Sequence, residues 1–260
     1  MSTTEQRVVI RPPRSKPPNL RVDRWWIGPV ITVTVLLAFI VYGTWVALIN
    51  ADYFVDPYLS PFYSPCLAAN CDETTWNLVG DWWRLSPALL ILPFPLLFRT
   101  TCYYYRKAYY RSFVWSPPAC AVPDAQSRYR GETRFPLILQ NAHRYFFYLA
   151  LPFPIILAWD ALKAFDFDGE FGMGLGTLVL LVNAVLLGLY TVSCHSCRHL
   201  VGGGLKSLSR APVRLRLWKV VTRLNVRHSR LAWISLFGVA LADVYVRLLA
   251  NDVFTDPRFF

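Results

Sequence analysis

The stretch MGLGTLVLLVNAVLLGLYTVSCHSCRH, residues Met173–His199, decides how this chain folds. Its first part, Met173–Ser193, carries no charged side chain and has about the 20 residues that a helix needs to cross a bilayer. Two cysteines and two histidines follow immediately, where such a helix would leave the membrane. Polar side chains at that depth are energetically expensive and commonly mark a functional site. The stretch therefore predicts a membrane helix that ends in a ligand-bearing motif.

The whole chain is too apolar for an ordinary soluble domain. Of its 260 residues, 55% are hydrophobic and only 17% are charged, and the mean hydropathy is +0.33. We predict an all-α polytopic membrane protein, built as a bundle of five transmembrane helices. The expected spans are Trp26–Ile49, Trp83–Phe98, Tyr145–Trp159, Met173–Ser193 and Leu231–Leu249.

The basic residues are confined to three segments that alternate with these spans. Residues 1–24 hold six Arg or Lys, residues 99–140 hold seven, and residues 195–230 hold nine with no acidic residue. Because cytoplasmic loops carry an excess of Lys and Arg, we expect a protein of the cell membrane with a cytoplasmic amino terminus and an outer carboxyl terminus. We expect residues 1–24 to form a mobile basic arm, residues 25–250 the anchor domain, and residues 251–260 an outer tail.

The net charge of +11 indicates partners at the cytoplasmic side. Because the charge alternates with the spans, a nucleic-acid-binding surface is not expected. The basic loops would fit an acidic soluble protein or anionic membrane lipid, and the sequence leaves both open.

The outer half of the protein carries three smaller signals. Cys66 and Cys71 lie in an outer loop, where an oxidising compartment permits a disulfide. Asp243 and Arg247 lie four residues apart on the fifth span, which favours an ion pair over a proton-transfer role. An LPFP element occurs twice, at residues 92–95 and 151–154, where proline is expected to bend the helix as a packing kink or beside a cavity.

All four histidines are expected at the cytoplasmic side with most of the cysteines. If the fourth span continues as a helix through His199, Cys194 and Cys197 share one face while His195 and His199 share another. One helix then cannot direct all four at one centre. A mixed site would combine Cys194 and Cys197 with imidazoles from neighbouring helices, namely His143 and His228. The second choice combines His195 and His199 with Cys102.

The histidine and cysteine donors are compatible with several bound groups. Haem b would take histidines from two helices, and a structural zinc is chemically possible, although a single CxxC is a weak zinc signature. A Rieske-type 2Fe–2S cluster needs two cysteines and two histidines, which this inventory supplies. A metal-free scaffold or transporter, with histidines that only form hydrogen bonds, is the alternative from another class.

Several segments together resemble a known family, the membrane-anchor subunit of actinobacterial succinate dehydrogenase, particularly the mycobacterial type. The resemblance covers residues from about 50 to 250 and rests on DPYLSPFYSPC, TCYYYRKAYYRSF with SPPACAVP, FPLILQNAHRYFFY, SCHSCRHLVGGG and LNVRHSRLAW. It implies a five-helix anchor that binds a flavoprotein subunit and an iron–sulfur subunit at the cytoplasmic face. The anchor would carry a Rieske-type cluster in place of haem and pass electrons from succinate oxidation to menaquinone, without binding succinate itself.

The resemblance also implies a set of site residues. The metal ligands would come from His143, Cys194, His195, Cys197, His199 and His228, with Cys194, Cys197, His143 and His228 as the first choice. A quinone pocket next to the centre would use Arg198 or one of Tyr103, Tyr104 and Tyr105 to bind the quinone carbonyl.

Overall fold

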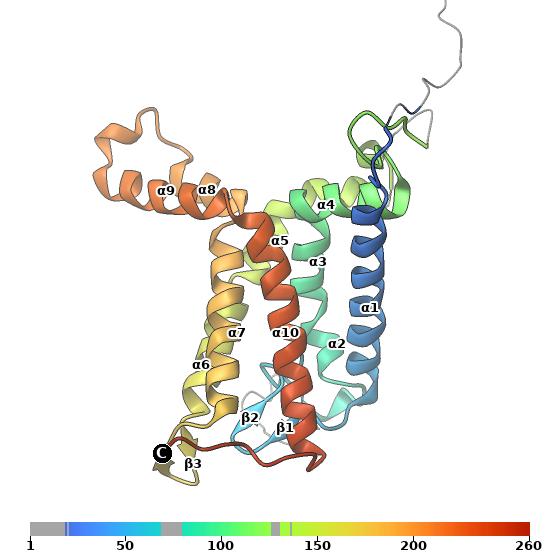
Figure 1. Ribbon diagram of the computed structural model, residues 1–260. Helices are drawn as coiled ribbons and strands as arrows, with labels where there is room; N and C mark the ends of the chain where they lie inside the picture. The colour runs from blue at the N-terminus through green and yellow to red at the C-terminus, as the bar shows by residue number, and fades with distance from the viewer. Residues whose placement is uncertain (1–18, 20, 69–79, 126–130, 136) are drawn as a thin grey trace, which may run out of the picture.

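The computed structural model describes residues 19, 21–68, 80–125, 131–135 and 137–260. Within this part the chain is mostly helical, and four helices are long and apolar enough to cross a membrane (Figure 1). They are α1 (Ile27–Ile49), the composite helix Leu137–Lys163, α7 (Leu175–Val192) and α10 (His228–Ala250). The composite helix consists of η4 (Leu137–Ala142), α5 (His143–Ala150) and α6 (Pro152–Lys163).

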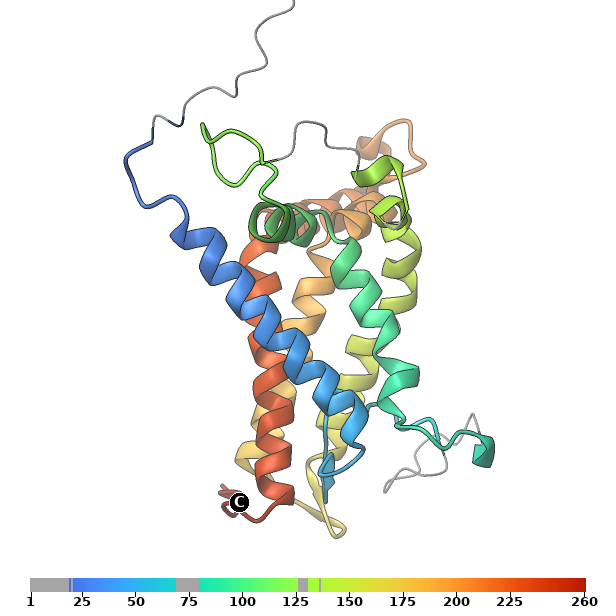
Figure 2. The same ribbon diagram turned by 90° about the vertical axis from the view of Figure 1, so that its right-hand side faces the viewer.

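The second predicted span is shorter than expected. It consists of α2 (Ala88–Ile91) and α3 (Pro93–Thr101), which together form an apolar helix of fewer than 18 residues. The expected fifth crossing therefore stays a prediction. Figures 1 and 2 show this helix running alongside the others, so it still forms part of the bundle.

The LPFP elements coincide with interruptions in both composite helices. Pro93 and Pro152 each occupy the first turn of a new helix, directly after Leu92 and Leu151. Proline fixes φ and lacks a backbone N–H, so it suits the first helical turn and disrupts the ladder before it. Leu92 and Leu151 keep helical backbone angles, with φ −60° and ψ −30° and with φ −58° and ψ −37°, so the predicted bends stay a prediction.

Short amphipathic helices lie across one end of the bundle. These are α4 (Tyr103–Tyr109), α8 (His195–Gly202) and α9 (Pro212–Asn225), and they run roughly at right angles to the long helices in Figure 1. The start of α1 lies at the same end. We call this end the basic face. The remaining short elements of the described chain are η1 (Gly80–Trp82), η2 (Tyr110–Val114), η3 (Gly131–Thr133) and η5 (Leu208–Arg210).

The opposite end, which we call the distal end, holds the carboxyl terminus and two small hairpins (Figure 1). Strands β1 (Phe54–Val55) and β2 (Tyr58–Leu59) pair antiparallel, as do β3 (Asp166–Phe167) and β4 (Glu170–Phe171). Cys66 lies here, buried and disulfide-bonded. Its predicted partner, Cys71, lies outside the described residues.

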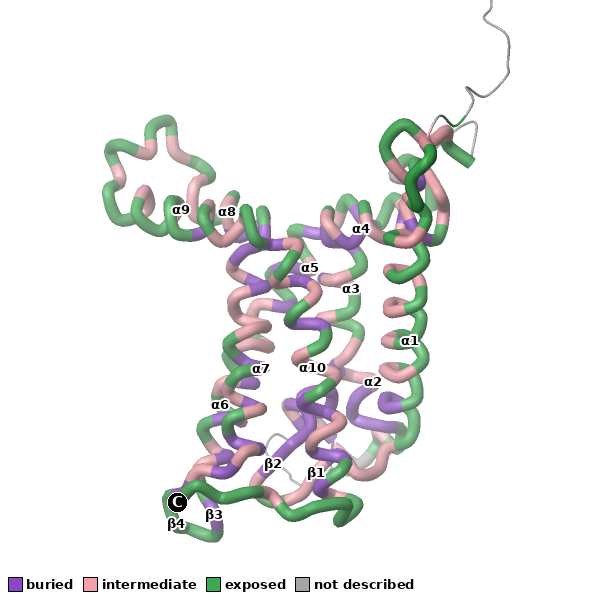
Figure 3. Tube along the Cα trace, in the orientation of Figure 1, coloured by how far each residue is buried: buried purple, intermediate pink, exposed green. Residues whose placement is uncertain are grey.

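The predicted pairing of Asp243 with Arg247 is confirmed. Arg247 Nε donates to Asp243 Oδ2 at 2.9 Å, and the Asp243 side chain is fully buried. The same carboxylate accepts hydrogen bonds from Tyr42 and Ser60, while Arg247 Nη1 donates to the carbonyl of Ala51 at 2.6 Å. Figure 3 shows the buried residues concentrated between the helices and near the hairpins. The carboxylate is therefore stabilised by three donors inside the bundle.

Candidate metal centre

Two cysteines and two histidines face each other in pairs at the basic face. His143 Nε2 lies 3.1 Å from Cys194 Sγ, and His228 Nε2 lies 3.3 Å from Cys102 Sγ. All four residues are buried. Each histidine is the first residue of its helix, α5 or α10, and each cysteine follows the end of a helix that runs along the bundle, α3 or α7. Four separate segments thus place sulfur and imidazole donors at one site.

The two cysteines have the same local conformation. Cys102 has φ −59° and ψ 131°, and Cys194 has φ −64° and ψ 145°. Both are extended residues at the N-cap position of the amphipathic helix that follows. The chain therefore turns sharply at each cysteine, from a helix along the bundle to one across its end.

A hydroxyl precedes each of these cysteines and binds one of the histidines. Thr101 Oγ1 lies 2.9 Å from His143 Nδ1, and Ser193 Oγ lies 2.7 Å from His228 Nδ1. Each hydroxyl fixes one ring nitrogen and leaves Nε2 directed at the cysteine of the other segment. Outer hydrogen bonds of this kind orient metal-binding histidines and set their tautomer.

An aromatic ring four residues before each cysteine stacks on the same histidine that the hydroxyl binds. Phe98 stacks on His143 with ring centroids 5.1 Å apart and an interplanar angle of 7°, and Tyr190 stacks on His228 at 5.1 Å and 11°. The site therefore repeats one pattern twice: an aromatic residue, two spacers, a hydroxyl residue and a cysteine. The repeats exchange partners, because each orients a histidine toward the cysteine of the other.

His195 lies beside this arrangement and is exposed. Its ring stacks on His143 at 5.6 Å, and one ligand atom from each of His143, Cys194 and His195 lies within 4.8 Å of the other two. Partial desolvation of the ring and the neighbouring His199 lower the pKa of His195, which favours the neutral imidazole that metals bind. Burial also raises the pKa of the Cys194 thiol to about 12, so a bound cation would be needed to hold it as a thiolate.

The assumption that Cys194–His199 continue the fourth span as one helix is wrong. Helix α7 ends at Val192, and α8 begins at His195 in a different direction. The predicted helical faces therefore do not apply across this break. Cys194 faces His143, whereas Cys197 contacts none of the histidines through its sulfur in the described part of the chain. Cys102 from the second-choice set occupies the position expected for Cys197.

The predicted quinone-binding residues are dispersed. Tyr105 is buried and donates to the carbonyl of Ala232, and Tyr104 accepts a hydrogen bond from Trp233. Tyr103 is exposed beneath Arg106, and Arg198 lies over the Trp218 ring. Tyr103, His195 and His199 line a polar pocket of about 380 Å³ that adjoins His143.

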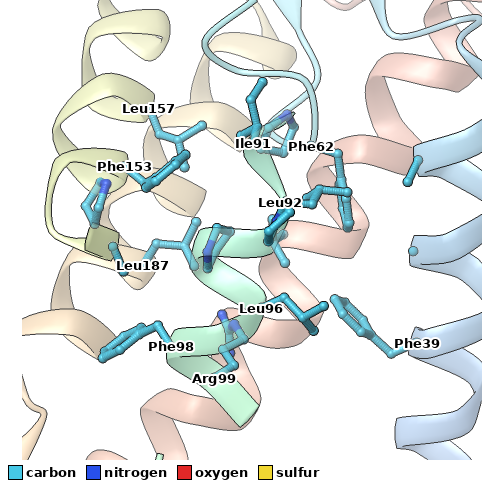
Figure 4. Close-up of a pocket in the computed structure, with 18 of the residues that line it drawn as sticks. Phe39, Phe62, Ile91, Leu92, Leu96, Phe98, Arg99, Phe153, Leu157 and Leu187 are labelled. Atoms are coloured by element: carbon cyan, nitrogen blue, oxygen red, sulfur yellow. The ribbon is translucent and has the colours of Figure 1, made fainter. Parts of the chain in front are cut away.

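An apolar cavity of about 370 Å³ lies next to the metal centre and was not predicted as a whole (Figure 4). Side chains from α1, α3, α6 and α7 line it, and the LPFP elements contribute Pro93, Pro95, Phe153 and Pro154. Phe98 and Tyr190, the rings that stack on the two histidines, also line this cavity. The cavity therefore reaches the aromatic residues of the metal centre.

Arg99 supplies a positive charge to the wall of this cavity. It donates to Tyr105 Oη at 3.0 Å, to the carbonyl of Ala232 at 3.3 Å and to Ser235 Oγ at 3.0 Å, and it lies 4.5 Å from the ring centre of Tyr190. Among the described residues no carboxylate pairs with it. Its charge is thus held by neutral groups within an apolar environment.

Comparison with known proteins identifies the family. A profile described as actinobacterial succinate dehydrogenase subunit SdhC matches residues 27–252. The chain is a member of this SdhC family. A structure of the Mycobacterium smegmatis Sdh1 complex in the apo form contains a chain that is 47% identical, with a TM-score of 0.88. The alignment covers 97% of the present chain and 98% of that one. A search of curated proteins gives no match.

Family membership confirms the resemblance inferred from the motifs, and the chain is a membrane-anchor subunit of succinate dehydrogenase. Four residues of this SdhC chain that orient or stack on the two histidines were not predicted from the sequence: Phe98, Thr101, Tyr190 and Ser193. The repeated pattern in FRTTC and YTVSC was the available signal, because the two pentapeptides share an aromatic residue, a hydroxyl and a terminal cysteine at the same spacing.

Proposed function

We propose that this SdhC chain holds a Rieske-type 2Fe–2S cluster at its basic face and transfers electrons from succinate oxidation to menaquinone. The observation that carries this proposal is that two cysteines and two histidines from four segments gather in one buried site at the basic face. Two thiols and two imidazoles are the ligands of a Rieske centre. We assign Cys102, Cys194, His143 and His228 as the ligands, with His195 as a neighbour.

The spacing of the donors favours a two-iron centre over a single zinc ion. Ligand atoms of one tetrahedral ion lie on the order of 3.5 Å apart, given metal–ligand bonds of about 2.0–2.3 Å. Among the described residues, the four donors do not form one group whose ligand atoms all lie within 4.8 Å of one another, so they do not surround a single ion. Haem is disfavoured because each Nε2 faces a thiol instead of an open apolar slot.

A bound cluster would supply one-electron transfer at the cytoplasmic side. The chain's own residues would orient and insulate it: Thr101 and Ser193 fix the imidazoles, and Phe98 and Tyr190 cover their faces. The Mycobacterium smegmatis match belongs to an Sdh1 complex. We infer that the present chain binds a flavoprotein subunit and an iron–sulfur subunit at its basic face, which the positive-inside rule places in the cytoplasm.

We propose the apolar cavity as the quinone site, in place of the dispersed residues predicted from sequence. Its apolar lining suits a lipid-soluble ring and its tail, and Arg99 offers the positive charge that would stabilise the quinone oxygen as it is reduced. Phe98 and Tyr190 lie between this cavity and the two imidazoles.

Ligand replacement tests the metal assignment. We expect Cys102→Ser and Cys194→Ser each to abolish bound iron and acid-labile sulfide in the anchor, and to remove its rhombic electron paramagnetic signal. Cys197→Ser is the matched control, because that cysteine is also buried at the basic face but faces no histidine. Loss of iron in Cys197→Ser and its retention in Cys102→Ser would refute the assignment. Sharp reduced haem bands in the purified complex would refute the cluster.

Filling the cavity tests the quinone site separately. Leu187 lines the cavity from α7, whereas Val182 lies on the same helix and is exposed toward the surroundings of the bundle. We expect Leu187→Trp to lower succinate-driven quinone reduction at least about tenfold while succinate oxidation by a soluble acceptor continues. Val182→Trp should leave both activities unchanged. Equal quinone reduction in the two variants would exclude this cavity.

A further inference from the structure

Helix α9 extends away from the bundle at the basic face. Figure 1 shows α8 and α9 projecting to one side of the long helices, and Figure 3 shows much of α9 exposed. Within residues 195–230, which include both helices, nine side chains are basic and none is acidic. This projection therefore needs a partner that tolerates a high positive charge.

One stripe of α9 is apolar and uncovered. Val213, Leu217 and Val220 follow one another at helical spacing, and their exposed fractions are 68%, 52% and 52%. At about 100° per residue these side chains lie within one narrow sector of the helix. No part of the described chain covers this stripe, so it faces the surroundings of the bundle.

A basic stripe runs directly beside the apolar one. Arg216, Lys219 and Arg223 share a second sector of α9, and all three are exposed. An uncovered apolar stripe flanked by basic residues is the pattern of a helix that lies in the surface of an anionic membrane.

The third side of α9 is fixed to α8. A Cβ at Gly202 would lie 2.7 Å from Trp218 Cδ1, so only glycine permits this close approach. Arg198 stacks over the same indole at 4.8 Å, and Arg214 Nε donates to the carbonyl of Val201 at 2.7 Å. These contacts set the rotation of α9, and the two exposed stripes point in defined directions as a result.

We propose that α9 binds the phosphate head groups of anionic phospholipids through Arg216, Lys219 and Arg223, while its apolar stripe rests on the acyl chains. The helix lies at the level where the long helices end (Figure 1). Because those helices are long and apolar enough to cross a membrane, we take this level as the membrane surface. This inference goes beyond electron transfer and does not depend on the metal centre.

Lipid titration of the intact, delipidated complex tests the proposal. Native mass spectrometry would compare dioleoylphosphatidylglycerol with dioleoylphosphatidylcholine, which have identical acyl chains. We expect the complex to prefer phosphatidylglycerol. The triple variant Arg216→Gln/Lys219→Gln/Arg223→Gln should weaken that binding on the order of fivefold for each charge removed. If the triple variant does not assemble, Lys219→Gln alone should show the single fivefold step.

A matched control separates α9 from net charge. Arg24→Gln/Arg84→Gln/Lys163→Gln removes the same number of charges elsewhere and should keep the lipid preference. Equal binding of both lipids by the unmodified complex would overturn the proposal, as would unchanged binding in the α9 variants. Loss of the flavoprotein or iron–sulfur subunit from the triple variant, with lipid binding intact, would instead assign the helix to a protein interface.

Discussion

The two ends of the bundle both bury polar side chains, yet they satisfy them differently. At the distal end, Asp243 and Arg247 have opposite charges, and Tyr42 and Ser60 complete the carboxylate's hydrogen bonds. At the basic face, Cys102 and Cys194 meet His228 and His143, which are all neutral or weakly polar partners. At the distal end the carboxylate is neutralised by a cation and accepts three hydrogen bonds, whereas at the basic face each imidazole meets a thiol and no carboxylate is part of either pair.

The comparison distinguishes two roles of buried polar side chains in a membrane protein: to stabilise the fold and to bind a ligand. A buried charge pair with several additional hydrogen bonds needs nothing further, and its removal affects folding. The imidazoles at the basic face, each oriented by a hydroxyl, match the metal ligands that we propose, and their replacement should affect metal binding more than folding. Mutations at the distal end should therefore lower the free energy of unfolding, whereas mutations at the basic face should lower the affinity for the metal.

The largest expected effect on folding is at the distal end. Arg247→Met leaves Asp243 buried without its cation, which should lower the free energy of unfolding by about 3–5 kcal/mol. Thermal unfolding of the purified complex in detergent would measure the loss. The double variant Asp243→Leu/Arg247→Met removes both charges and should recover most of that stability. If the double variant is no more stable than Arg247→Met, the ion pair is not what stabilises this end.

At the basic face we expect an effect of intermediate size, which changes the affinity for the metal but not the stability of the fold. Thr101→Val removes the hydroxyl that orients His143 with little change in shape, and the affinity for the metal should fall about 10- to 100-fold. Iron released to a chelator over time would measure this change. Thr100→Val is the neighbouring control, because that hydroxyl binds only backbone carbonyls of its own helix. Unfolding temperatures should remain close to that of the unmodified complex.

The smallest effect distinguishes stacking from hydrogen bonding at the same histidine. Phe98→Leu keeps an apolar side chain but removes the ring that lies parallel to His143, and we expect a loss of about 0.5–1.5 kcal/mol in unfolding free energy. Metal content should remain, since no donor or orienting hydroxyl is changed. A complete loss of iron in this variant would contradict the assignment of the Thr101 hydroxyl as the main orienting group.

The sequence predicted the long helices well because their signal is continuous. The span expected at Met173–Ser193 is the helix Leu175–Val192, and the one expected at Trp26–Ile49 is Ile27–Ile49. The second span is short because its helix begins only at Ala88, after Pro87, and ends at Thr101, before the extended Cys102. A continuous apolar run thus predicts that a helix is present, but not the residue at which it begins.

Most residues of the candidate metal centre were predicted from the sequence, but their arrangement in space was not. Sequence placed His143, His228 and Cys194 on one side of the membrane, and the structure brings these three together. Cys197 does not share a helix face with Cys194, because the chain leaves the helical conformation at Cys194. Neither a glycine nor a proline marks this position in the sequence. The backbone angles at Cys102 match those at Cys194, and this similarity shows that the same turn occurs twice in the structure.

The exchange of partners between the two repeats has a consequence for how the protein is made. Cys102 and His228 lie 126 positions apart in the chain, and the other pair comes from segments between them. A growing chain that lacks α10 has three of the four donors but can form only one of the two pairs, because His228 is the first residue of that helix. The proposed cofactor would then bind only after α10 has inserted and packed against the other helices, so its presence would indicate that the bundle is complete.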